Sequence, residues 1–302
     1  MADLNLKTTL CGIEMKNPLT TASGTFNPQA HSAYYDLGVL GAVTVKGVAD
    51  VPWAGNETPR IAETYGGMLN SVGLMNPGAE AFIRDDIPFI RKYDTKLIVN
   101  LAGHSIPEYC RVAEMLNEAD IDMMELNISC PNIKEGGAAF GTNAKVAEEV
   151  VKAVRKVVTK PLIVKLSPNV TDICEIARAA EAGGADALSL INTLLGMRID
   201  VYRRKPVLAN KMGGFSGPAI HPVAVRIVYQ VHKAVPLPIV AMGGVQSGED
   251  VAEFIMAGAT MVATGTINLV EPASPVRILG ELESFMEKTG VKDISEIRGI
   301  ID

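Results

Sequence analysis

Eight short, largely apolar runs recur along the chain, each bounded by Gly, Pro or Asn. Near-continuous apolar runs of this length are typical of parallel β-strands that are covered on both faces. This repeated feature constrains the fold more than any other. The predicted strands are residues 19–22, 42–45, 97–101, 123–128, 162–166, 187–191, 239–242 and 261–264.

Amphipathic segments separate the runs. In residues 143–158, Val146, Val150, Val154 and Val157 recur at helical spacing beside a charged face, which predicts a helix. A second helix is predicted over residues 172–182. Strand and helix alternating eight times is the pattern of a (β/α)8, or TIM, barrel, although a doubly wound open sheet would give a similar pattern.

The connections vary greatly in length. Residues 46–88 and 192–222 are too long for simple crossovers and are rich in Gly, Pro and Asn, so we expect functional loops after the second and sixth strands. A third glycine-bearing loop follows the fourth strand. Residues 4–18 predict a small N-terminal hairpin that turns at Cys11 and Gly12 and closes the barrel bottom. With no linker in sight, residues 1–302 are predicted to form one domain.

Composition excludes several classes of protein. The formal net charge of −6 argues against a protein that binds the nucleic-acid backbone. No apolar stretch reaches the roughly 20 residues of a membrane span, and no signal peptide is apparent. The four cysteines and four histidines are too scattered for a metal site or an iron–sulfur cluster. We therefore expect a soluble, cytoplasmic protein without a metal.

The predicted strands end in polar residues and glycines. In a barrel these ends form the catalytic face, so their polarity favours an enzyme. Glycines after the seventh and eighth strands suit a phosphate site that is built from backbone N–H groups. The strand-end residues are Ser23, Lys46, Gly47, Asn100, Asn127, Ser129, Cys130, Lys165, Asn192, Thr193, Gly243, Gly244, Gly265 and Thr266.

Two lysines among them indicate an anionic ligand. Lys165 lies inside an apolar run, so its ammonium must reach the barrel mouth or be buried at a cost of several kcal/mol. A cation placed there could stabilise the charge on a reduced flavin. Lys46 ends another strand in the same way. The alternative is that either lysine extends into water.

Asparagines and one cysteine complete the candidate chemistry. Asn70, Asn100, Asn127 and Asn192 each offer a donor and an acceptor, which suits a pyrimidine or a flavin, although Asn is also common in turns. Cys130 opens a glycine-bearing loop, where a thiol is accessible and could act as a base near neutral pH. Cys11, Cys110 and Cys174 carry no such signal.

Several segments together resemble the dihydroorotate dehydrogenases, and the stretch from residue 56 to 77 looks most like the class 1B catalytic subunit. The resemblance runs in family order from about residue 20 to 266. The matching segments are 22–24 (ASG), 56–60 (NETPR), 67–74 (GMLNSVGL), 127–132 (NISCPN), 134–137 (KEGG) and 242–245 (MGGV).

The resemblance implies FMN as cofactor and Cys130 as the base that removes a proton from C5 of dihydroorotate while a hydride leaves C6. It assigns FMN contacts to Ser23, Lys46, Gly47, Asn100, Asn127, Lys165, Ile191, Gly217, Gly243, Gly244, Gly265 and Thr266. It assigns the pyrimidine to Lys46, Asn70, Ser71, Val72, Gly73, Leu74, Asn127, Asn192 and Thr193, with Lys46 near the carboxylate.

The chain has neither a dinucleotide-binding motif nor cysteines for a cluster, so a reduced flavin would need an outside electron acceptor. The resemblance implies what that acceptor is. Electrons would pass to NAD through a second subunit that carries FAD and a [2Fe–2S] cluster, with the catalytic chains paired as a homodimer in a heterotetramer. Two enzyme alternatives stay open: a flavin-dependent dihydropyrimidine oxidoreductase that acts on uracil or thymine, and a flavin-free phosphosugar isomerase or aldolase. A binding barrel without catalysis is the third.

Overall fold

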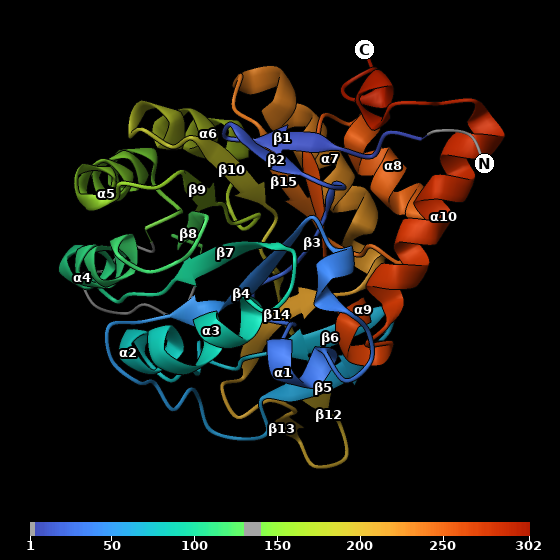
Figure 1. Cartoon of the computed structure of the whole chain (residues 1–302). Coiled ribbons are helices and arrows are strands. Elements are labelled where there is room, and N and C mark those ends of the chain that lie inside the picture. Colours follow the sequence, from blue (N-terminus) through green and yellow to red (C-terminus); the bar gives the residue numbers. More distant parts are fainter. Residues whose placement is uncertain (1–3, 130–139) are drawn as a thin grey trace.

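Eight parallel strands form a barrel in the computed structural model, which describes residues 4–129 and 140–302 (Figure 1). Their order in the sheet is β3, β16, β15, β10, β9, β8, β7, β4. The predicted (β/α)8 barrel is thereby confirmed. The strands are β3 (Leu19–Thr21), β4 (Ala42–Val48), β7 (Lys96–Leu101), β8 (Met123–Asn127), β9 (Leu162–Lys165), β10 (Ala187–Leu190), β15 (Ile239–Met242) and β16 (Met261–Thr264).

Threonine side chains join the two ends of this sheet. The Thr44 N–H donates to Thr21 Oγ1 at 3.0 Å, and the same hydroxyl donates to the Thr44 carbonyl at 3.0 Å. Thr20 Oγ1 and Thr44 Oγ1 lie 3.0 Å apart. All three residues are buried, so the barrel closes between β3 and β4 through hydroxyl groups.

Helices surround the barrel and bury one face each against it (Figure 1). The predicted helix at 143–158 is observed as α5, where the Asn143 side chain caps the N-terminus by accepting from the Val146 N–H. The longer helices are α4 (Ile106–Asn117), α5 (Ala144–Val157), α6 (Ile173–Ala182), α7 (His221–Ala234), α8 (Gly248–Met256) and α10 (Ser274–Thr289).

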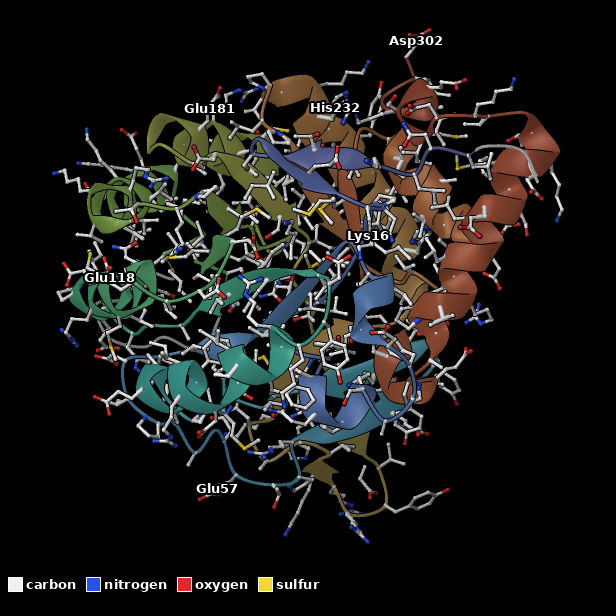
Figure 2. All side chains as sticks on the ribbon, in the orientation of Figure 1. Lys16, Glu57, Glu118, Glu181, His232 and Asp302 are labelled. Atoms are coloured by element: carbon white, nitrogen blue, oxygen red, sulfur yellow. The ribbon has the colours of Figure 1, made fainter. Side chains whose placement is uncertain are left out.

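Shorter helical segments lie in the connections. They are α1 (Pro28–His31), α2 (Ala79–Ala81), α3 (Ile87–Ile90) and α9 (Ile267–Val270), a π-helical stretch at Phe82–Asp86, and 3₁₀ turns at Leu37–Val39, Pro218–Ile220 and Ile294–Ile297. Charged side chains such as Glu57 and Glu118 point outward from the ribbon (Figure 2). Among the helices that the structure describes, none is long and apolar enough to cross a membrane.

The N-terminal hairpin closes one end of the barrel, as predicted. It consists of β1 (Thr8–Leu10) and β2 (Ile13–Met15) and turns at Cys11 and Gly12, both with positive φ. Two positive φ values in succession are the signature of a tight hairpin turn whose twist matches the strands. Leu10 and Met15 are fully buried against residues that point into the barrel.

A second sheet, which the sequence did not predict, lies at the opposite end (Figure 1). Its antiparallel strands come from the long loops after β4 and β10, in the order β11 (Leu194–Met197), β14 (Met212–Ser216), β6 (Gly67–Asn70), β5 (Ile61–Thr64). A short pair, β12 (Ile199–Asp200) and β13 (Lys205–Pro206), extends from it. Both long loops are therefore folded over the carboxyl ends of the barrel strands.

Candidate functional site

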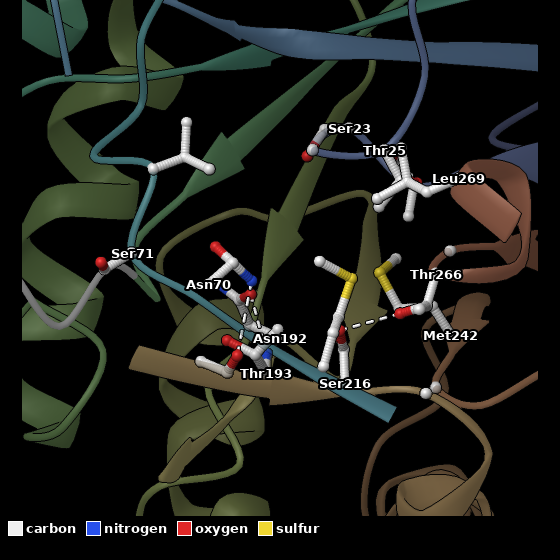
Figure 3. Close-up of a pocket in the computed structure, with 18 of the residues that line it drawn as sticks. Ser23, Thr25, Asn70, Ser71, Asn192, Thr193, Ser216, Met242, Thr266 and Leu269 are labelled. Atoms are coloured by element: carbon white, nitrogen blue, oxygen red, sulfur yellow. Dashed lines mark hydrogen bonds between the residues drawn. The ribbon is translucent and has the colours of Figure 1, made fainter. Parts of the chain in front are cut away.

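A cavity of about 400 Å³ lies between the barrel mouth and the second sheet (Figure 3). Asn70, Asn192 and Thr193 gather at one side, and Met242 and Thr266 lie at the other. Most of the predicted site residues meet in its lining, from segments far apart in the sequence. They are Ser23, Lys46, Asn70, Ser71, Val72, Gly73, Leu74, Asn127, Lys165, Ile191, Asn192, Thr193, Gly217, Gly243, Gly244, Gly265 and Thr266.

Among the described residues, two that were predicted for the site do not line the cavity. Gly47 and Asn100 lie against each other, because a β-carbon on Gly47 would come within 2.8 Å of Asn100 Oδ1. Asn100 is fully buried in the barrel interior. Cys130 lies outside the described residues, so its predicted role as base remains a prediction.

Lys165 is a buried cation at the floor of the cavity. Its side chain is 5% exposed, and its Nζ lies 3.4 Å from Ser23 Oγ and 3.8 Å from Glu125 Oε1. The lysine therefore does not extend into open water. Because Nζ has a carboxylate on its inner side and borders the cavity, it can present a positive charge to an anionic or electron-rich ligand.

Lys46 brings a second positive charge to the cavity. It lies where β4 shifts its register against β7, between Val45 and Val48, and such an irregularity can re-aim a side chain. Burial lowers the pKa of the Lys46 ammonium, and the charges of Arg60 and Lys165 lower it further. All three cations line the cavity, so an anion would relieve their mutual repulsion.

Hydrogen bonds fix the orientation of the amides at the barrel mouth. Asn127 Oδ1 accepts from the Ser129 N–H at 3.2 Å and from Ser129 Oγ at 2.6 Å, which leaves Nδ2 to donate. Asn192 Nδ2 donates to Ser129 Oγ at 2.5 Å, and its Oδ1 accepts from the Thr193 N–H at 2.8 Å. The Tyr109 hydroxyl donates to the Asn127 carbonyl at 2.6 Å. The amides are thus oriented before any ligand binds.

The loop before β5 supports residues 71–74. Asn56 Nδ2 donates to the Ser71 carbonyl at 2.9 Å, and the Asn56 N–H donates to the Val72 carbonyl at 3.0 Å. Gly73 has a φ of +75°, and a β-carbon there would lie 2.6 Å from Asn56 Cγ. Only glycine fits this close approach, so the loop presents backbone groups to the cavity.

Glycines shape the opposite wall, after β15 and β16. Gly244 has a φ of +74°, and a β-carbon there would lie 2.8 Å from His221 Cβ and 2.9 Å from the Gly217 carbonyl oxygen. Thr266, whose hydroxyl donates to Ser216 Oγ at 2.8 Å, follows β16 (Figure 3). Backbone at these two strand ends is suited to hold a phosphate group.

Several residues of the site are not evident from the sequence alone. Arg60 stands out only as part of a matching segment, yet it lines the cavity and donates to the Asn56 carbonyl at 3.2 Å. Glu125 was hidden within an apolar run, although a charged residue there could have been recognised, as Lys165 was. Met68 and Ser216 line the cavity from the second sheet, so they could not be placed without it.

Outside the cavity, other reactive side chains are partly buried or already hydrogen-bonded. Burial raises the pKa of the Cys11 thiol to about 12, at the far end of the barrel. Among the described residues, His221, Asp250 and Glu253 are close enough to share an ion. However, Asp250 caps α8 and His221 Nδ1 lies 2.9 Å from the Gly243 carbonyl oxygen, so both are already engaged.

Comparisons with known proteins show which family the chain belongs to. The family model for dihydroorotate dehydrogenase matches residues 5–286. The chain is 60% identical over 300 residues to a protein of Alkaliphilus metalliredigens and 61% identical over 300 residues to one of Alkaliphilus oremlandii, covering 99% of each chain in both comparisons. It is 54% identical over 299 residues to one of Lachnoclostridium phytofermentans, covering 99% of this chain and 100% of the relative. Each relative is named dihydroorotate dehydrogenase B (NAD(+)), catalytic subunit. The chain therefore belongs to the dihydroorotate dehydrogenase family.

Proposed function

We propose that the chain oxidises dihydroorotate to orotate in pyrimidine biosynthesis, with FMN as its cofactor and NAD as the final acceptor. Family membership supports the reaction, and the relatives' names, which include NAD(+) and catalytic subunit, support the acceptor and a partner subunit. The observation that carries the proposal is the meeting of one buried lysine, one half-buried lysine and several oriented amides in one cavity.

The residues present fit FMN. Gly217, Gly243 and Gly244 line the cavity with bare backbone, because a β-carbon at each position would clash with neighbouring protein atoms, and exposed backbone of this kind suits a phosphate group. Ser71 Oγ is buried at the cavity wall and has no hydrogen-bond partner among the described residues, so it has a bond to offer to a ligand. Lys165 supplies the cation that favours a reduced, electron-rich flavin. The Ser23 hydroxyl would help to hold the Lys165 ammonium in place.

The substrate would bind by charge and by hydrogen bonds. Lys46 would hold the carboxylate of dihydroorotate, since its ammonium is already crowded by other cations. Asn127 Nδ2 would donate to a ring carbonyl, and Asn70 and Asn192 would meet the remaining polar edge of the ring. The ring would thereby be held in one orientation, with a specific face toward the cofactor.

Cys130 would act as the base. It follows directly on Ser129, whose hydroxyl joins the two amides of the barrel mouth. Its thiolate would remove the proton from C5 of dihydroorotate while C6 loses a hydride. Bound FMN would supply the acceptor for that hydride. Asn127 and Lys46 would keep C5 within reach of the thiolate.

Anaerobic absorption spectroscopy tests the proposal directly. When the purified chain has been reconstituted with FMN, its flavin absorbance is expected to bleach on addition of dihydroorotate. Dihydrouracil, which lacks the carboxylate, is expected to leave the absorbance unchanged. Equal bleaching by both compounds would favour a dihydropyrimidine oxidoreductase. If no FMN binds, the proposed cofactor is wrong, and a flavin-free reaction becomes the better hypothesis.

The finer assignment of partners rests on the class 1B resemblance. We propose a cytoplasmic heterotetramer in which two copies of this chain form a homodimer, each with an electron-transfer subunit that holds FAD and a [2Fe–2S] cluster. NAD reduction by dihydroorotate is expected only when both subunits are present. An equal rate of NAD reduction by this chain alone would contradict the need for a partner.

A further inference from the structure

Glu125 is a buried carboxylate to which the proposed reaction gives no role. It lies on β8, two residues before Asn127, and its side chain is 2% exposed. Asn100 Nδ2 donates to Glu125 Oε1 at 2.5 Å, and Lys165 Nζ lies 3.8 Å from the same oxygen. Glu125 is not among the residues that line the cavity, so it lies behind Lys165 in the barrel interior.

A carboxylate at this position is costly. Removing a charge from water costs several kcal/mol unless other groups compensate, and apolar residues fill the adjacent layer of the barrel interior. Stability alone is a weak explanation, because a buried ion pair can often be replaced by apolar residues at no loss. The 3.8 Å separation is also too long for a direct hydrogen bond, so Glu125 acts on Lys165 through its charge.

The other groups around Lys165 do not balance its charge. Ser23, after β3, and Ser189, its register partner on β10, are neutral. Lys46 on β4 is close enough to interact with Lys165 and carries the same sign. Glu125 is therefore the carboxylate that is paired with this cation among the described residues.

We propose that Glu125 is a positioning residue that holds the Lys165 ammonium at the cavity floor and offsets part of its charge, thereby lowering the reduction potential of the bound flavin. The inference rests on the proposed function. Unopposed cations at the cavity would stabilise the reduced flavin and make it a poorer electron donor. A partly balanced charge suits an enzyme that must pass its electrons to NAD.

The test compares Glu125→Gln with the wild-type chain, both loaded with FMN, in anaerobic equilibrium with a reference redox dye. Gln keeps the shape and the acceptor for Asn100 Nδ2 but removes the charge. We expect the equilibrium to shift at least tenfold toward reduced flavin, which corresponds to about 30 mV for a two-electron couple. Ser189→Ala, which changes the same layer without changing charge, should leave the equilibrium unchanged.

A second variant keeps the test possible if Glu125→Gln does not fold. Glu125→Asp retains the charge but withdraws it from Lys165 by one methylene, so we expect a smaller shift in the same direction. An unchanged equilibrium, or a shift toward oxidised flavin, in whichever variant folds and holds FMN overturns the inference. A wild-type chain that binds no FMN overturns both the inference and the proposed function, whereas a wild-type chain that is bleached by dihydroorotate beside an unshifted variant overturns the inference alone.

Discussion

Asn192 Nδ2 donates a hydrogen bond to Ser129 Oγ at 2.5 Å, and the same hydroxyl donates to Asn127 Oδ1 at 2.6 Å. One hydroxyl thus connects two amides that line the cavity. Ser129→Ala should raise the KM for dihydroorotate about three- to tenfold, since each lost hydrogen bond is worth about 1 kcal/mol. Steady-state kinetics would measure the change.

A serine far from the cavity provides the control for this substitution. Ser284 Oγ donates to the Gly280 carbonyl on the exposed face of α10. Ser284→Ala should leave KM at the wild-type value. If Ser129→Ala also left it there, the hydroxyl would not orient the amides for substrate binding.

Lys46 should make orotate binding depend on pH. Its pKa is lowered from 10.5, chiefly by burial. Without ligand, Lys46 is therefore more fully protonated in the unfolded chain than in the folded chain at pH values between the lowered pKa and 10.5. The free energy of unfolding should therefore rise with pH through this window. Orotate binding should weaken there by up to about tenfold per pH unit, because the neutral amine attracts the carboxylate weakly.

Titration of the flavin absorbance with orotate at several pH values would reveal this dependence. Lys46→Arg is the matched control, because arginine stays charged over the whole range. Any ionisation of orotate itself would appear in both proteins. A wild-type titration that parallels Lys46→Arg at every pH would exclude Lys46 as the group responsible.

The barrel was predictable because its strands are short, apolar and regularly separated by amphipathic segments. All eight predicted strands are observed to within a few residues, and the Asn143 cap lies where the helical pattern begins. The second sheet was not predictable. Its strands are four or five residues long, three of the four contain glycine, and β6 pairs with β14 across more than 100 residues, as Asn70 does with Gly214. Such pairing leaves no local periodicity to read.

The candidate site was predicted unevenly for a similar reason. Lys165 and Asn127 stand out because polar residues at the ends of buried strands are conspicuous. Arg60 does not, since its sequence neighbourhood is polar, and only the fold brings it to the cavity. Gly47 and Asn100 show the reverse case: they lie at strand ends and contact each other, but neither is among the residues that line the cavity.

The threonine closure of the barrel should be important for stability. Thr21→Val would leave the buried Thr44 N–H and carbonyl without the hydroxyl that bonds both. We expect the free energy of unfolding to fall by about 2–4 kcal/mol, whereas Thr21→Ser, which keeps the hydroxyl, should lose less than about 1 kcal/mol. Calorimetry of both variants would decide; equal unfolding temperatures would refute the bridging role of the hydroxyl.

Gly244 should be required for cofactor binding. Gly244→Ala forces a β-carbon against His221 and the Gly217 carbonyl at a φ of +74°, so the loop must move. We expect FMN affinity, measured by fluorescence titration, to fall at least about tenfold, the cost of roughly 1.4 kcal/mol. Gly280→Ala in α10 meets nothing within 4 Å and should keep wild-type affinity. Equal affinities in the two variants would argue against a phosphate cradle at Gly244.

Cys130 should be required for flavin reduction and dispensable for flavin binding. Cys130→Ser replaces the thiol with a much weaker acid, so proton removal from C5 should slow by about 10²- to 10⁴-fold in stopped-flow reduction by dihydroorotate. The FMN content should match that of the wild type, because no cofactor contact is assigned to this side chain. Raising the pH should speed wild-type reduction until the thiol is ionised, whereas Cys130→Ser should lack this rise. Wild-type reduction rates in the variant would exclude Cys130 as the base and direct attention to the other groups at the barrel mouth.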